Sequence, residues 1–189
     1  VKEYDFDWSI QLRIDSINQE LVDLLRNTRC RYLFVGVESA DDKVLKSMRM
    51  GITLAQIEEA LDMLKNAGLN SRSGVIFGDT VETFESAMFT LDWFKKNYTK
   101  YRMFVDMIIA FPGSTLYKRG CESGVIPNPV DFLKDGCPII NLSQMNDLEF
   151  ADLVSTIEKI NYRKPEKYQI DFRKQEIPRN RSKIHHYRF

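Results

Sequence analysis

Residues 74–83, GVIFGDTVET, have the types and spacing that could best build a ligand site. The apolar beginning predicts a strand, Gly78 and the polar residues after it predict a turn, and a helix is expected to start just beyond. Glycines let another group approach the backbone closely, and the first turn of a helix offers N–H donors that lack partners within the helix. The segment therefore predicts a site for a flat or anionic ligand, although an ordinary strand-to-helix turn explains the same residues equally well.

The composition is that of a globular protein with one sizeable core. The 189 residues are 43% hydrophobic and 29% charged, and 27 basic residues balance 27 acidic ones. This balance argues against nucleic acid as a partner, and no run of about 18 apolar residues predicts a membrane span. The charge is uneven at the end, where residues 161–189 contain nine basic and three acidic residues. We interpret residues 163–189 as a basic, extended tail.

The three cysteines, Cys30, Cys121 and Cys137, form neither a CxxC pair nor a spacing suited to zinc. An odd number of cysteines without a signal peptide predicts structural thiols in a reducing cytoplasm, and no metal site is expected from them. The two histidines lie at 185 and 186, within the basic tail. No residue is identified as catalytic.

Strand and helix signals alternate along the chain. Strands are predicted at 8–14 and 32–37, within the segment that opens at Gly74, and at 103–111. Helices are predicted around 21–25, 43–48, 53–68, 84–97, 116–124 and 147–160, with capping boxes at Ser16–Gln19 and Thr53–Gln56 and an irregular connection at 126–145. Four strand-then-helix units predict an α/β protein with a parallel sheet.

Polar and glycine residues gather where the predicted strands end, and parallel strands bring these ends to one edge of the sheet, where ligands bind. Helix caps place some of the same residue types there for structural reasons alone. Asp106 lies within an apolar strand, so we expect a buried carboxylate that is paired with Arg13 or a substrate. For Arg13 itself a local ion pair is favoured. The residues at the four strand ends are Arg13 and Asp15; Glu38 and Ser39; Gly78, Asp79 and Glu82; and Pro112, Gly113 and Ser114.

Five short motifs occur in an order that resembles the second half of a radical SAM enzyme, close to the group that often carries an upstream cobalamin-binding domain. They are GVES at 36–39, GIT at 51–53, AGL at 67–69, GVIFGDTVET at 74–83 and FPGSTLY at 111–117. The resemblance implies a partial, TIM-like barrel of six β/α units, of which residues 1–162 supply about four, followed by a C-terminal helix and the tail.

In the family that this chain resembles, a CxxxCxxC loop holds a [4Fe–4S] cluster whose open iron binds S-adenosylmethionine. This sequence has no such loop. The resemblance therefore implies a missing N-terminal half with the cluster ligands. It also implies that the complete enzyme, an Fe–S oxidoreductase or a methyltransferase, cleaves S-adenosylmethionine reductively, and that this chain alone is inactive.

The resemblance also implies roles for individual residues. Glu38 and Ser39 are expected to contact the ribose or the amino acid part of S-adenosylmethionine, and the strand with Gly74, Ile76 and Gly78 to pass beside adenine. Glu82 either closes that motif or is a first-turn carboxylate favoured by the helix dipole. Phe111, Pro112 and Gly113 are expected to complete the adenine pocket, while the barrel mouth or substrate site would include Arg13, Asp15 and Asp106.

The sequence departs from the family pattern at two positions. Thr80 stands where members often have proline, and Met50 stands where many have a basic residue, with Arg49 one residue earlier. Two alternatives stay open. One is an ordinary β/α-barrel enzyme that binds a phosphorylated substrate, although a lysine or arginine near Gly78 is lacking in the sequence. The other is a non-catalytic module whose basic tail docks on RNA or on a protein.

Overall fold

The computed structural model describes residues 6–162, so the predicted basic tail lies outside the described residues. Four strands form one sheet in the order β1-β2-β3-β4 with every neighbouring pair parallel. The strands are β1 (Trp8–Arg13), β2 (Cys30–Glu38), β3 (Ser71–Phe77) and β4 (Met103–Met107). Helices alternate with them, which confirms the predicted partial β/α barrel with a C-terminal helix.

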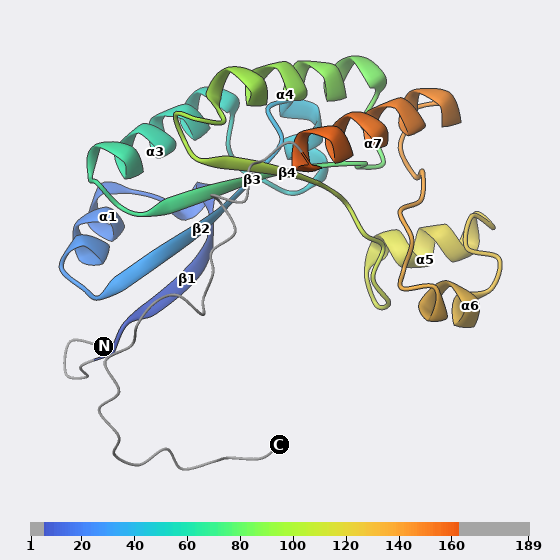
Figure 1. The fold of residues 1–189 in the computed structure, drawn as a ribbon, viewed down its shortest axis with the longest axis horizontal. Coiled ribbons are helices and arrows are strands. Elements are labelled where there is room, and N and C mark those ends of the chain that lie inside the picture. The colour runs from blue at the N-terminus through green and yellow to red at the C-terminus, as the bar shows by residue number, and fades with distance from the viewer. Residues whose placement is uncertain (1–5, 163–189) are drawn as a thin grey trace, which may run out of the picture.

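The helices fall into two groups, as Figure 1 shows. The larger group covers one face of the sheet, whereas the smaller, which we call the α5–α6 lobe, lies apart beyond the end of β4. The covering helices are α1 (Gln19–Arg26), α2 (Asp42–Ser47), α3 (Leu54–Asn66), α4 (Phe84–Asn97) and α7 (Asp147–Tyr162). The lobe consists of α5 (Thr115–Glu122) and α6 (Pro129–Lys134).

Local capping decides where most helices begin and end. The Thr53–Gln56 capping box is present at the start of α3, and Gly68 follows that helix with a φ of 69°. The predicted Ser16–Gln19 box is wrong, because residues Ile14–Ser16 form a 3-10 turn of their own and the Ser16 hydroxyl donates to the carbonyl of Arg13. Asn18 caps α1 instead, since its side chain accepts from the N–H of Leu21.

Two other predicted boundaries need correction. Residues 126–145 are not wholly irregular, because Asn128 caps the short helix α6 and Pro129 occupies its first turn, where a missing N–H costs nothing. The strand predicted at 103–111 ends at Met107. The N–H of Ile108 still donates to the carbonyl of Phe77, after which the chain leaves the sheet toward the lobe.

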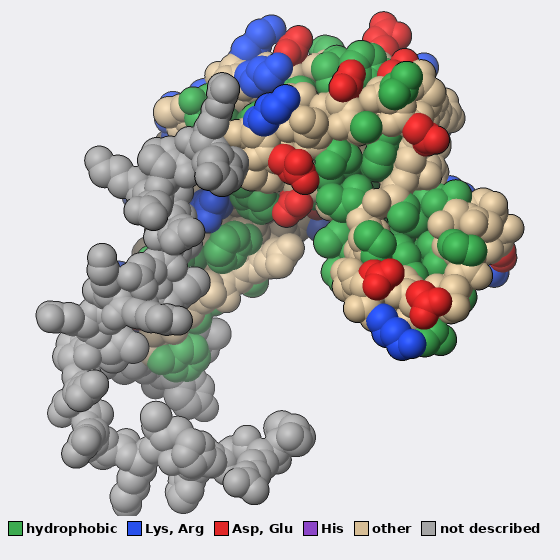
Figure 2. Space-filling model, turned by 45° about the vertical axis from the view of Figure 1, so that its right-hand side comes forward, with side chains coloured by type: hydrophobic (Ala, Val, Ile, Leu, Met, Phe, Trp, Pro, Cys, Tyr) green, Lys and Arg blue, Asp and Glu red, His purple; other side chains and the backbone are tan. Residues whose placement is uncertain are grey.

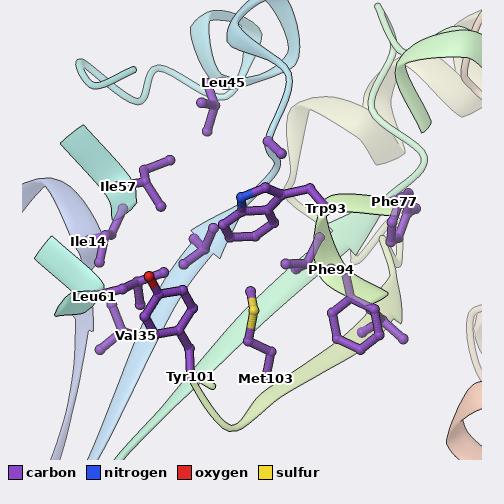
Figure 3. Packing of buried hydrophobic residues seen from close by; sticks show 14 of the residues in the cluster. Ile14, Val35, Leu45, Ile57, Leu61, Phe77, Trp93, Phe94, Tyr101 and Met103 are labelled. Atoms are coloured by element: carbon purple, nitrogen blue, oxygen red, sulfur yellow. The ribbon is translucent and has the colours of Figure 1, made fainter. Parts of the chain in front are cut away.

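The main core lies between the sheet and the covering helices. Alternate strand residues such as Val35, Phe77 and Met103 point toward the helices, and Figure 3 shows them packed with Leu61 and Phe94. We call this helix-covered side the outer face of the sheet. A second, smaller cluster, Ala110, Ile126, Phe132 and Cys137, holds the α5–α6 lobe together.

Candidate cofactor site at the carboxyl edge of the sheet

The inner face of the sheet is the side opposite the covering helices, and strand register arranges its residues in rows. Arg13 pairs with Gly36, Gly36 with Gly74, and Gly74 with Phe104. In the next row toward the carboxyl edge, Ile76 of β3 pairs with Asp106 of β4. Gly74 and Ile76 thus lie on the same face and close to the edge where the strands end.

The glycines of this face leave room for two large side chains. A Cβ added at Gly36 would lie 2.1 Å from Oε1 of Glu38, and one added at Gly74 would lie 2.7 Å from Cζ of Phe104. The Arg72 guanidinium carbon lies 5.4 Å from the centre of the Phe104 ring, at cation–π distance. In this structure, the flat group against Gly74 is therefore the ring of Phe104.

Glu38 and Ser39 are adjacent in sequence but differ in their surroundings. Glu38 is half-buried with a φ of 70°. Burial raises the pKa of its carboxyl group, and the positive charge of Arg13 lowers this pKa by a smaller amount. Ser39 is 0% exposed, and its hydroxyl shares a hydrogen bond with that of Thr90 at 3.1 Å and accepts from the N–H of Asp41. The expected contact of Ser39 with a cofactor therefore finds no support, because its hydroxyl holds α2 and α4 to the end of β2.

Arg13 pairs locally, as the sequence favours. Its Nη2 lies 2.6 Å from Oδ2 of Asp15 and also donates to the carbonyl of Arg49 at 2.8 Å. The pair raises the pKa of Arg13 and lowers that of Asp15, chiefly through the hydrogen bond between the two side chains. Asp106 was expected to be buried and paired, and this is wrong, because the inner face of β4 is open and its carboxylate is exposed.

The turn after β3 closes on itself. Gly78 has a φ of 108°, which an L side chain adopts only with strain, and its N–H donates to Oε2 of Glu82 at 2.6 Å. The Glu82 side chain is 0% exposed, and its Oε1 has no hydrogen-bond partner among residues 6–162. Burial, the largest cause, raises the pKa of Glu82 to about 7, and Asp79 and Asp41 add to it.

Glu82 is not a first-turn carboxylate of α4, because Thr83 is the N-cap of that helix and Phe84 its first residue. The side chain instead bridges the turn from its end back to its beginning. In this structure, Glu82 supports the backbone at Gly78 through that hydrogen bond.

Two distant segments hold the same turn. The N–H of Gln144 donates to the carbonyl of Glu82 at 2.9 Å, and Nη1 of Arg119, from α5, donates to Oγ1 of Thr80 at 2.8 Å. Arg119 was missed by sequence reasoning, since it lies 39 residues from Thr80 and belongs to none of the motifs. No lysine or arginine is close to Gly78 in the sequence, but the fold brings Arg119 to the turn that Gly78 begins.

The segment between β4 and α5 borders the edge. Phe111 is 59% exposed, and its carbonyl accepts from the N–H of Ser114, which caps α5. Gly113 completes this turn with a φ of 86°. On the other side, Met50 belongs to the core, whereas Arg49 is exposed and has a φ of 56°.

Residues 6–162 contain no group of three or more histidine, cysteine or acidic side chains that could hold a metal ion. Cys30 begins β2, whereas Cys121 and Cys137 lie in or beside the α5–α6 lobe. The cysteines therefore do not form the ligand set of an iron–sulfur cluster. None of the helices in this described range is both long and apolar enough to cross a membrane.

Solved structures with this fold include radical SAM enzymes. The radical S-adenosylmethionine methyltransferase TsrM from Kitasatospora setae, solved with cobalamin and a [4Fe–4S] cluster, matches with a TM-score of 0.52 and 19% identity, over 61% of this chain and 23% of that one. Elp3 from Methanocaldococcus infernus matches with a TM-score of 0.51 and 18% identity, over 83% of this chain and 42% of that one. At such identities the likeness shows a shared fold.

Sequence comparison is more specific. An uncharacterized methyltransferase of Pyrococcus horikoshii is 27% identical over 122 residues, which are 65% of this chain and 26% of the relative. Bacteriochlorophyllide d C-8(2)-methyltransferase of Chlorobaculum tepidum is 26% identical over 129 residues, 67% of this chain and 28% of the relative. The chain thus spans about a quarter of the length of these relatives. The family model of the radical SAM superfamily matches residues 4–94, slightly less than half of the chain, and the chain is similar to this superfamily over that range.

Proposed function

We propose that this chain forms one wall of the S-adenosylmethionine site of a radical SAM methyltransferase. The observation that carries the proposal is the pair Ile76 and Gly78, which lies at the carboxyl edge of β3 within the sequence that resembles the family's adenine-binding motif. The methyltransferases among the relatives support transfer of a methyl group as the reaction.

The inner face suggests where adenine would lie. The Phe104 ring covers Gly74, so the nearest open position is one row further, against the half-buried side chain of Ile76 and next to the turn at Gly78. Phe111 is exposed on the segment that follows β4, and we propose that its ring covers the other side of the base. A flat base between an aliphatic side chain and an aromatic ring gains favourable apolar contact, which fits adenine.

Glu38 would serve the polar part of the cofactor. Its carboxylate lies over Gly36 on the inner face, next to the row of Ile76. A half-buried carboxylate accepts hydrogen bonds from ribose hydroxyls or from an ammonium group, and the ammonium would lower its raised pKa. We assign Glu38 the role of orienting S-adenosylmethionine along the edge.

The cluster ligands belong outside this chain, because its three cysteines do not come together in the structure. When bound, the cluster supplies the electron for cleavage of S-adenosylmethionine, and this chain positions the cofactor. We also propose that another part of the complete protein binds cobalamin, because cobalamin is bound in the structure of TsrM. The chain alone is accordingly expected to be inactive.

The test is a titration of the 189-residue chain with S-adenosylmethionine, followed by amide NMR signals. We expect weak, saturable binding that shifts the signals of Ile76, Gly78 and Phe111. The variant Ile76→Glu, which places a charge against adenine, should weaken binding about tenfold or more. Gln11→Glu adds the same charge on the inner face of β1 and serves as the matched control.

Unchanged binding in Ile76→Glu would contradict the proposed adenine position. Shifts confined to other elements would do the same. Tight binding without iron would contradict the claim that the rest of the enzyme completes the site.

A further inference from the structure

Resting on the proposed function, we propose that Arg119 and Thr80 form an anion subsite at the barrel mouth, which binds a carboxylate or phosphate group of the substrate. The pair joins α5 to the turn after β3 through the hydrogen bond between Nη1 and Oγ1 at 2.8 Å. The subsite lies beside the proposed adenine position, because Thr80 follows Gly78 by two residues.

Arg119 has hydrogen-bond donors that its contact with Thr80 does not use. A guanidinium carries five N–H donors, and the contact with Thr80 uses one of them. The side chain is exposed and forms no ion pair with any of residues 6–162. The neighbouring cation, Lys118, differs in this respect, since its Nζ lies 3.7 Å from Glu122 on the same helix.

Thr80 adds a second donor. Because its oxygen accepts from Arg119, its own O–H proton is available to another acceptor. An anionic oxygen placed against the pair would receive the hydroxyl proton and a guanidinium N–H together. The planar guanidinium matches the geometry of carboxylate and phosphate oxygens. The proline that often occupies this position in the family could supply no hydroxyl.

The turn that carries Thr80 is held in place before any ligand binds. Glu82 and Gln144 bond to its two ends, as described above. The Asp79 carboxylate is buried and accepts from the N–H of Val81, whereas the Arg119 guanidinium is exposed. The exposed charge at the pair is therefore the positive charge of Arg119.

Exposed apolar side chains lie on the segments next to the pair, and they narrow the class of substrate that we propose. Val81 follows Thr80 directly and is exposed, and exposed Ile109 and Phe111 lie on the segment that joins β4 to α5. Figure 2 shows hydrophobic side chains both on the α5–α6 lobe and on the flank of the body beside it. The arrangement fits a substrate with an apolar body and an anionic group.

The experiment titrates the 189-residue chain with sodium acetate and with inorganic phosphate at constant ionic strength, observed through the Thr80 amide and the Arg119 Nε–H signals. We expect saturable shifts with at least one anion, and the tighter anion tells carboxylate from phosphate. Arg119→Gln should weaken its binding at least about tenfold, because a charge-assisted hydrogen bond is lost. Lys118→Gln removes the same charge one residue away and should leave binding nearly unchanged.

A second pair of variants tests the hydroxyl. Thr80→Val keeps the shape of the side chain and should weaken anion binding, whereas Thr80→Ser should retain it. Shifts with neither anion would overturn the proposal, and so would equal losses in Arg119→Gln and Lys118→Gln.

Titration with S-adenosylmethionine separates this proposal from the proposed function. Signals of Ile76 and Gly78 report the cofactor site, and we expect them to respond equally in Arg119→Gln and in the unaltered chain. Weaker cofactor binding in Arg119→Gln would mean that the cofactor carboxylate occupies the pair, which would overturn the assignment to substrate. The unaltered chain could also bind the anion at Thr80 and Arg119 while S-adenosylmethionine leaves the Ile76 signal unchanged. This result would contradict the cofactor site and support the anion subsite.

Discussion

The outer and inner faces of the sheet consist of alternate residues of the same four strands, yet their chemistry is opposite. On the outer face, Val35, Val75 and Phe77 are fully or almost fully buried against the helices. On the inner face, neighbours of these residues are half-buried or exposed and include charged side chains, a glycine and aromatic rings, namely Phe34, Gly36, Glu38, Arg72, Ile76, Phe104 and Asp106.

The difference shows that folding and function draw on separate sets of positions here. Apolar burial supplies most of the free energy of folding, so the outer face should carry the stability of the described domain. The inner face keeps polar groups at the surface, which costs stability but provides contacts for a ligand. Substitutions on the two faces should therefore affect different measurements.

Truncation of a ring on each face gives the largest expected effect. Phe77→Ala removes a ring that is 0% exposed and should lower the free energy of unfolding by about 3–5 kcal/mol. Phe104→Ala removes a half-buried ring and should cost about 1 kcal/mol. Urea unfolding measures both, and equal losses would show that the inner face contributes to stability as much as the outer one.

The buried carboxyl of Glu82 should make stability depend on pH. Burial raises the pKa of Glu82 from 4.5 to about 7, so the folded state keeps a proton that the unfolded state has already lost in this interval. The stabilisation is complete below about pH 4.5 and disappears as the pH rises to about 7, with a total on the order of 3 kcal/mol. Unfolding in urea at pH 5, 6, 7 and 8 checks the slope.

Glu82→Gln carries no titrating proton, so its free energy of unfolding should fall less over the same interval. Glu85→Gln changes an exposed carboxyl group three residues later and should keep the slope of the unaltered chain. An equal slope in Glu82→Gln would show that the buried carboxyl of Glu82 does not titrate with a raised pKa.

The sequence predicted the architecture well because the relevant signals are local. Apolar runs marked the strands, and the box at Thr53 and the glycine at 68 marked the ends of α3. The errors also had local causes. Ser16 has the spacing of a cap, but Asn18 competes for that role, and the short helix α6 begins at a proline within the segment predicted to be irregular.

The candidate site was less predictable, because its contacts join residues that are distant in sequence. The motif drew attention to Gly78 and Glu82, but spacing could not show that the carboxyl of Glu82 is buried and accepts from the N–H of Gly78. Ser39 was predicted to contact the cofactor, and spacing could not show that its hydroxyl shares a hydrogen bond with Thr90 of α4. No sequence motif pointed to Arg119, because it lies on a helix of ordinary composition and only the fold brings it to Thr80.

A subtler effect is expected at the inner-face glycine of β2. In Gly36→Ala, the new methyl group would lie 2.1 Å from Oε1 of Glu38, so the carboxylate must turn toward solvent. Because burial is what raises the pKa of Glu38, this pKa should fall toward the ordinary value of a glutamate. Titration of the Glu38 side-chain carboxyl carbon by NMR measures the change.

Gly51→Ala is the matched control, because nothing lies within 4 Å of a Cβ at Gly51 and the Glu38 titration should stay unchanged. A pKa that stays raised in Gly36→Ala would mean that the space over Gly36 does not determine the burial of Glu38. A fall in this pKa with little change in the free energy of unfolding would separate the two faces most clearly. The carboxylate would then be held over Gly36 at little benefit to stability, as expected for a group that serves a ligand.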